Sequence, residues 1–210
     1  MMSGEHRERE RIAQESARIM LDEGVRDYAA AKRKATEQLM VGGRANLPSN
    51  LEVEDAMLER RRLFADADEL AELQAMREVA LRVMRRLNGF EPRLVGGVLK
   101  GTAGAGARAT LHVFAESPET FLIALMDRGL RYREAERTLR IGGVQRSFPS
   151  AVLRVDPVEV EALIFPLDGL RQAPSSPVDG RPVRRAGVDE VAELVEGRLA
   201  DLLGAERLVV

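Results

Sequence analysis

Apolar residues recur every three to four positions along the first 90 residues, which is the spacing of amphipathic helices. The longest such stripe predicts a helix over residues 68–88, and Gly89 supplies its stop. Ser49 and Glu52 have the spacing of a capping box, which predicts the start of another helix. The same periodicity predicts two earlier helices over about 12–21 and 27–41, the second ended by Gly42-Gly43.

The pattern changes at Pro92 to short apolar runs rich in β-branched residues, separated by turn residues. These runs predict strands at 93–99, 110–115, 130–141, 151–155 and 158–165. Ser117-Pro118 is typical of a helix start and predicts a helix over 117–129. A last amphipathic helix is expected from Val188 to Leu202. Strands joined by short links should pair antiparallel, whereas strands joined across the 117–129 helix can be parallel.

This order of elements predicts an α+β fold. We expect one mixed sheet of about five strands packed by helices, preceded by a helical N-terminal region, because each sheet face and helix stripe needs an apolar partner. The expected domains are a helical extension over 1–66 and an α+β domain over 67–210.

Composition removes several classes of function. The 210 residues are 45% hydrophobic and carry a net charge of -2, so nothing drives the whole chain toward nucleic acid. Cysteine is absent, which excludes disulfides, zinc–thiolate sites and thiol nucleophiles. The charged N-terminus is not followed by an apolar run, and no segment approaches the length of a membrane span. We therefore expect a cytoplasmic protein without a membrane partner.

The glycine-rich run Gly101–Ala107 is the first candidate site. Backbone N–H groups of Gly101, Thr102 and Gly104 could approach a phosphate closely. A dinucleotide fingerprint requires the glycines to open a helix, but a strand pattern follows here. A P-loop requires Gly-Lys-Ser/Thr, and Lys100 instead precedes the glycines. The alternative to a ligand site is a flexible connection between two strands.

The same segment resembles the nucleotidyltransferase superfamily. The resemblance lies in Val98-Leu-Lys-Gly-Thr102, a loop, and then Thr110-Leu-His-Val-Phe114. It implies a Gly-Ser-like turn at the end of a first strand and two carboxylates, one residue apart, on the second strand. A further carboxylate on a later strand would help these two to hold a pair of metal ions.

The chain departs from that pattern at the carboxylates. The pair falls either on Arg108 and Thr110 or on Thr110 and His112, and none of these residues is acidic. Mg²⁺ prefers oxygen ligands, carboxylates above all. Glu159 and Glu161 fit the later carboxylate, but alone they would not hold two metal ions. The resemblance therefore implies a pseudoenzyme that has lost nucleotidyl transfer and uses neither metal nor cofactor.

Two further groups of residues could carry chemistry. His112 is one of two histidines, and it lacks an orienting carboxylate or nucleophile in the pattern, so a polar strand position is the alternative to catalysis. The first two helices resemble a helix-turn-helix in outline, with Lys32-Arg33-Lys34 on the second. Neighbouring acidic residues neutralise this cluster, which favours solvated helix faces over DNA binding.

The loop from Arg171 to Arg185 is the most unusual stretch, and we call it the arginine loop. Arg171, Arg181, Arg184 and Arg185 are set among prolines, and arginine forks suit phosphate or carboxylate. A connector that crosses the sheet is the alternative. Together with the Gly101-Thr102 turn and a Tyr28-x3-Lys32 motif, Ser176–Pro182 is similar to a proteobacterial family sometimes labelled UDP-N-acetylmuramate–alanine ligase. Such ligases need an ATP P-loop and several domains, and the sequence shows neither.

Three hypotheses follow from the sequence. The first is a nucleotidyltransferase-like domain without its catalytic carboxylates, which acts as a binding or regulatory module. The second is an enzyme that acts on a nucleotide or another phosphorylated small molecule through the Gly101 loop and the arginine loop, with His112, Glu159 and Glu161 as catalytic candidates. The third is a DNA-binding regulator that works through the N-terminal helices.

Overall fold

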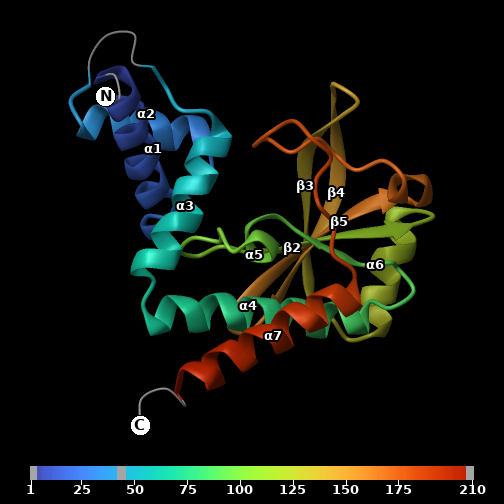
Figure 1. The fold of residues 1–210 in the computed structure, drawn as a ribbon. Helices are drawn as coiled ribbons and strands as arrows, with labels where there is room; N and C mark the ends of the chain where they lie inside the picture. The colour runs from blue at the N-terminus through green and yellow to red at the C-terminus, as the bar shows by residue number, and fades with distance from the viewer. Residues whose placement is uncertain (1–3, 42–45, 207–210) are drawn as a thin grey trace. The chain divides into compact units, whose positions relative to one another are not determined.

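The computed structural model describes residues 4–41 and 46–206, the last nine of these through their backbone only. They form two compact units (Figure 1). The helical unit comprises the residues up to Ala67 together with Gly101–Ala107 and Ser176–Arg181. The sheet unit comprises Asp68–Lys100, Arg108–Ser175 and the residues from Pro182 onward. No helix in the described part of the chain is long and apolar enough to cross a membrane.

Among its described residues the helical unit contains three helices: α1 (Gly4–Asp22), α2 (Tyr28–Gln38) and α3 (Asn50–Phe64). The Asp27 side chain caps α2 by accepting a hydrogen bond from the Ala30 N–H over 2.7 Å. The predicted capping box of α3 is confirmed, since Ser49 and Glu52 satisfy each other's backbone N–H groups. Helix α2 ends at Gln38, three residues before the expected end at Val41, and Gly42-Gly43 lies outside the described residues.

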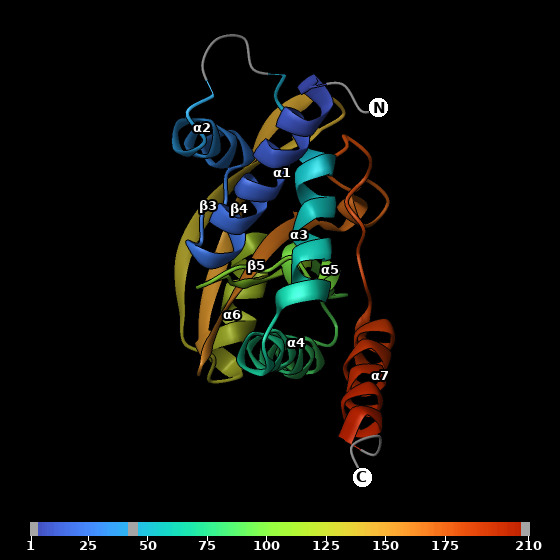
Figure 2. The same cartoon turned by 60° about the vertical axis from the view of Figure 1, so that its left-hand side comes forward.

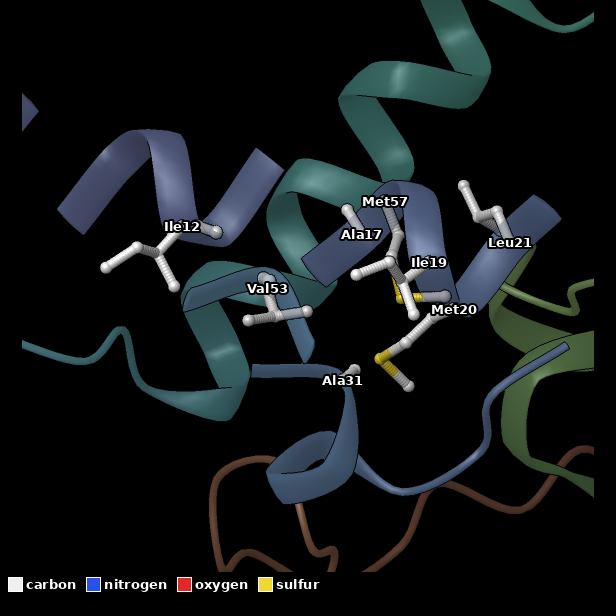
Figure 3. Packing of buried hydrophobic residues seen from close by; sticks show 10 residues of the cluster. Ile12, Ala17, Ile19, Met20, Leu21, Ala31, Val53 and Met57 are labelled. Carbon is white, nitrogen blue, oxygen red and sulfur yellow. The ribbon is translucent and has the colours of Figure 1, made fainter. Parts of the chain in front are cut away.

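The core of the helical unit lies between these three helices. Ile12, Ala17 and Ile19 of α1 are fully buried, and they meet Ala31 of α2 and Val53 of α3 (Figure 3). These residues come from one stripe of each helix, as the sequence periodicity indicates. The small alanine side chains bring the helix backbones close together.

The sheet unit contains five strands and four α-helices among its described residues. In chain order the elements are α4 (Ala67–Arg86), β1 (Arg93–Val95), α5 (Gly96–Lys100), β2 (Ala109–Ala115), α6 (Pro118–Asp127), β3 (Tyr132–Ile141), β4 (Val144–Val155), β5 (Val158–Pro166), a 3₁₀ turn η1 (Leu167–Leu170) and α7 (Val188–Glu206). The strand order is β1-β2-β5-β4-β3. This mixed sheet packed by helices confirms the predicted α+β class.

The strand directions follow the lengths of the connections. The β3–β4 and β4–β5 pairs are antiparallel hairpin partners (Figure 2), and β1 pairs antiparallel with β2. The parallel pair in the sheet is β2 with β5. Strand β3, which follows β2 across α6, lies instead at the far edge of the sheet. The chain therefore returns to the centre of the sheet through the β3–β4 and β4–β5 hairpins, and β5 becomes the parallel partner of β2.

Two predicted strands have different bounds. The strand expected over 93–99 ends at Val95, because the left-handed Gly96 (φ 73°) breaks it and Val98 and Leu99 bury their side chains from the short helix α5. Strand β4 begins at Val144 rather than at residue 151. Its polar start and Pro149 hide the strand pattern, and Pro149 is tolerated because the pairing with β5 begins only at Ser150.

One face of the sheet is apolar and covered by helices. Leu111, Val113 and Val160 on this face are fully buried. Helix α6 contacts both β2 and β5, with Phe121 and Leu125 buried. Helix α4 buries its own stripe from Leu73 to Met84 and lies beside α7 (Figure 1). There Gln74 Nε2 donates to the Val195 carbonyl over 3.2 Å. The opposite face of the sheet combines charged side chains with a buried apolar cluster of Phe114, Phe148, Leu163 and Phe165, and it carries the candidate site.

Met76 tests the packing of α4. Its side chain is 3% exposed. Met76→Asp would bury an unpaired charge, and we expect a loss of several kcal/mol in the free energy of unfolding. Chemical denaturation measures this loss. Arg82→Asp, on the exposed side of the same helix, is the control and should change stability by less than about 0.5 kcal/mol. Equal effects of the two substitutions would contradict this packing.

Candidate functional site

The pairing register places alternate residues of every strand on one face of the sheet, which we call the arginine face. Of the charged residues within the described strands, this face carries five arginines and two glutamates: Arg93, Arg133, Arg137, Arg146, Arg154, Glu159 and Glu161. Strand β3 shows most clearly how positive and negative side chains are separated between the two faces. Its Arg133 and Arg137 lie on the arginine face, whereas Glu134 and Glu136 lie on the other. The arginine face therefore has an excess of positive charge, which favours an anionic ligand.

His112 lies in β2 on the arginine face, and its side chain is 3% exposed. Its Nδ1 accepts a hydrogen bond from Arg185 Nε over 3.0 Å. An accepting imidazole nitrogen carries no proton, so the proton of the neutral ring is on Nε2. Burial, together with the charges of Arg185 and Arg137, lowers the pKa of His112 to about 3. A ring that stays neutral near pH 7 is poorly suited to general acid–base catalysis.

Two backbone hydrogen bonds fix Arg185 beside the sheet. The Leu94 N–H donates to the Ala186 carbonyl over 2.8 Å, and the Ala186 N–H donates back to Leu94 over 2.9 Å. Because Ala186 lies opposite Leu94, the side chain of its neighbour Arg185 falls on the arginine face. Arg185 Nη1 also donates to the Gly169 carbonyl over 2.8 Å. The end of the arginine loop is thereby held against β1 and η1.

The Arg185 guanidinium remains a half-buried cation without a carboxylate partner among the described residues. It lies 5.0 Å from the ring centre of Phe114 and 5.3 Å from that of Phe165, within the range of cation–π attraction. Burial and the nearby charge of Arg93 lower the pKa of Arg185 to about 10, which leaves it charged near pH 7. Arg185 therefore contributes an uncompensated positive charge beside His112.

Glu161 is the buried carboxylate of the arginine face, with a side chain that is 5% exposed. Its Oε2 lies 2.5 Å from Arg137 Nη2, and its Oε1 accepts a hydrogen bond from Ser150 Oγ over 3.3 Å. Thr110 lies directly opposite Glu161 in the β2–β5 pairing. Glu159, the other acidic candidate, pairs with Arg108 over 2.5 Å. An arginine side chain thus compensates each glutamate of this face.

These residues do not fit the metal pair that the resemblance implies. Thr110 and His112 occupy alternate positions of β2 beside Glu161, where the implied carboxylates would lie. Arg137 already compensates Glu161, and the His112 nitrogen Nδ1 is engaged by Arg185. A divalent cation here would meet two guanidinium groups. No group of three or more acidic or histidine side chains in the described part of the chain is arranged to hold a metal.

The glycine-rich run has a different setting from the predicted one. A short helix, not a strand, leads into it, and the glycine pair that ends β1 is Gly96-Gly97. The run belongs to the helical unit, where the Ala105 N–H donates to the Leu21 carbonyl over 2.8 Å. A Cβ at Gly104 would lie 2.3 Å from the Met20 carbonyl oxygen. The absence of a side chain at Gly104 therefore serves close packing of the loop on α1.

The arginine loop is divided between the two units. Arg181 belongs to the helical unit, where its Nε lies 4.0 Å from Asp179. Arg184 belongs to the sheet unit and pairs with Glu190, while Arg171 is exposed. Of the four predicted arginines, Arg185 is the one that the structure brings to His112.

The basic residues of the N-terminal helices make contacts inside the helical unit. Lys32 Nζ donates to the Pro48 carbonyl over 3.0 Å, and Lys34 pairs with Glu23. Arg60 pairs with Asp22 over 2.9 Å, and Arg61 donates to the Ala103 carbonyl over 2.6 Å. Lys32, Lys34 and Arg60 thus make contacts within the helical unit, and the DNA-binding hypothesis stays a prediction.

Sequence reasoning missed Arg93 and Arg137. The signal for Arg137 was present in β3, where Arg133 and Arg137 share one parity and Glu134 and Glu136 share the other. The position of Arg93 could not be predicted from the sequence, since it depends on the pairing of β1 with β2, which places Arg93 opposite His112. No protein-family model, curated protein or solved structure matches the chain, so the arrangement of these residues carries the functional argument.

The lowered pKa of His112 predicts a specific dependence of stability on pH. The unfolded ring takes up a proton near its ordinary pKa of 6.5, and the folded ring does so only near 3. The contribution of the neutral ring is therefore complete above pH 6.5 and is lost as the pH falls toward 3. Relative to His112→Asn, the wild type should lose stability over this window, as measured by urea denaturation at several pH values. Parallel curves for the two proteins would contradict a buried neutral imidazole.

Proposed function

We propose that the sheet unit is a nucleotidyltransferase-like module that binds a phosphorylated small molecule or nucleotide without a metal ion and transfers no nucleotidyl group. The observation that carries this proposal is the ion pair between Arg137 and the buried Glu161. In the related chemistry a metal ion would neutralise that carboxylate and the phosphates of the substrate. Here a guanidinium neutralises the carboxylate.

The charge on the arginine face supports phosphate as the group recognised. Guanidinium groups donate two parallel hydrogen bonds to phosphate and keep their charge across the physiological pH range. Arg93 and Arg137 have side chains that are 29% and 39% exposed, so their donors reach solvent. The carboxylate paired with Arg93 is Glu91, whose side chain is 58% exposed and easily displaced by a stronger anion.

The absence of transfer chemistry follows from the residues in β2. A nucleotidyl transfer needs the attacking hydroxyl activated and the developing charge on the triphosphate neutralised. Thr110 has no charge, and His112 is neutral with Nδ1 already bonded to Arg185. The residues of this face can therefore orient a phosphate but do not supply a base for an attacking hydroxyl.

Ligand binding tests the first half of this proposal. Inorganic phosphate, pyrophosphate, ATP and a sugar phosphate would be added to the protein in EDTA and in Mg²⁺, and the melting temperature followed. A ligand present at 100 times its Kd stabilises the native state by about 2.7 kcal/mol, roughly 5 to 10 °C for a chain of this size. We expect at least one ligand to produce this rise in EDTA. No rise with any ligand, or a rise that requires Mg²⁺, would overturn metal-free binding.

A matched pair of variants locates the binding. Arg133→Gln removes a cation from the arginine face, and Arg140→Gln removes one from the other face of the same strand. We expect the first to weaken binding about tenfold, since a hydrogen bond to a charged group contributes about 1.5–3 kcal/mol. The second should leave the Kd within about twofold of the wild type. Equal losses would mean that net charge, rather than this face, binds the ligand.

Radiolabelled nucleotides with Mg²⁺ test the second half. We expect no transfer of a nucleotidyl group to any acceptor, because the carboxylates that hold the metal ions are replaced. Turnover that Glu161→Gln abolishes would show that the remaining carboxylate is catalytic.

A further inference from the structure

Two loop segments outside α1–α3 belong to the helical unit, and each leads directly into the candidate site. Gly101–Ala107 precedes β2, and His112 follows Ala107 by five residues. Ser176–Arg181 precedes the end of the arginine loop, and Arg185 follows Arg181 by four residues. The two partners of the 3.0 Å hydrogen bond on the arginine face are therefore the covalent continuations of two segments that the helical unit holds.

The first segment is held near the C-terminal end of α3. Arg61 Nη2 donates to the Ala103 carbonyl over 2.6 Å. The bond from the Ala105 N–H to Leu21 and the tight contact of Gly104 with α1 hold the same segment from its other side. A charge-assisted bond to a partly buried carbonyl is among the stronger contacts available to a loop. Arg61 therefore fixes the chain shortly before β2 begins.

The second segment is held at the N-terminal end of α3. Asn50 Nδ2 donates to the Pro177 carbonyl over 2.7 Å. The orientation of this amide is set by Lys32, whose Nζ donates to Asn50 Oδ1 over 2.8 Å and leaves the NH₂ group to face Pro177. The Ser49–Glu52 capping box then fixes the first turn of the helix. Asn50 thus anchors the chain shortly before Arg185.

We propose that α3 positions the Arg185–His112 pair through these two contacts, so that the state of the helical unit regulates anion binding at the arginine face. Helix α3 contacts both segments, and each segment continues into one partner of the pair within five residues. The coupling is reciprocal, and an anion on the arginine face would in turn order α3. The regulatory part rests on the proposed function, whereas the positioning part concerns geometry alone.

The test uses the full chain with two substitutions on α3. Asn50→Asp keeps an acceptor for Lys32 but removes the donor to Pro177, and Arg61→Ala removes the donor to Ala103. Arg62→Ala, an exposed neighbour on the same helix, is the control, and Arg61→Lys restores a donor. A His6→Gln background leaves His112 as the single imidazole, whose ¹⁵N spectrum reports the tautomer. Hydrogen exchange over residues 108–115 and 182–187 reports how well ordered the chain is around His112 and around Arg185.

We expect Asn50→Asp and Arg61→Ala to shift or broaden the His112 nitrogen signals and to raise exchange in both segments. The dissociation constant for inorganic phosphate or ATP should increase about fivefold, at the low end of typical coupling between sites. Arg62→Ala should match the wild type, and Arg61→Lys should recover most of the His112 spectrum. A helical circular dichroism signal equal to that of the wild type shows that each variant is folded.

The alternative is that these contacts only stabilise the helical unit. In that case the folded variants would melt earlier but keep the His112 spectrum, the exchange rates and the Kd of the wild type, and the inference would be overturned. A changed spectrum with an unchanged Kd would overturn regulation. If the wild type binds no anion at all, the proposed function fails, and the spectrum and exchange still decide whether α3 positions the pair.

Discussion

The pairing of buried charge on one sheet face is the constraint on which the rest of the structure depends. A carboxylate as enclosed as Glu161 must be neutralised or hydrogen-bonded, and Arg137 and Ser150 do both. The neighbouring imidazole must stay neutral, and the bond from Arg185 to Nδ1 together with burial keeps it so. Once these pairs are in place, Arg185 remains on this face as a charged guanidinium beside the neutral His112 ring.

That constraint also explains the path of the arginine loop. The Arg185 side chain donates hydrogen bonds to His112 and the Gly169 carbonyl and lies against two phenylalanine rings. The Leu94–Ala186 backbone pair sets the position of its backbone. The last residue of the arginine loop is thus held against β1 and η1 and is also part of the candidate site. The two interpretations of this loop are compatible, because the same guanidinium anchors the chain and contributes positive charge.

Much of the fold follows from local rules that the sequence displays. The α3 capping box, the Ser117 cap of α6 and the stripe of α4 appear as predicted, since each depends on residues a few positions apart. The start of β4 was missed because its register comes from the partner strand β3, against a polar local pattern. The end of β1 was missed because a left-handed glycine, rather than a change in hydrophobicity, stops it.

The candidate site was only partly predictable for a related reason. Glu161, His112 and Arg185 stood out as residue types, but their contacts join positions 73 apart for His112 and Arg185 and 11 apart for Ser150 and Glu161. Such pairings depend on strand order, which sequence periodicity does not encode. The glycine-rich run was ambiguous from the sequence, because close approach to a phosphate and close approach to a helix both require glycine.

The central claim is that arginines take the place of a metal ion on this face, and Mn²⁺ titration followed by NMR tests it most directly. A bound Mn²⁺ ion broadens the resonances of nearby nuclei. The account predicts that submillimolar Mn²⁺, added in the absence of phosphate, leaves the signals of His112 and of the Ser150 and Glu161 amides unbroadened. Selective broadening of these three residues would show that the face holds a divalent cation, and would contradict the account.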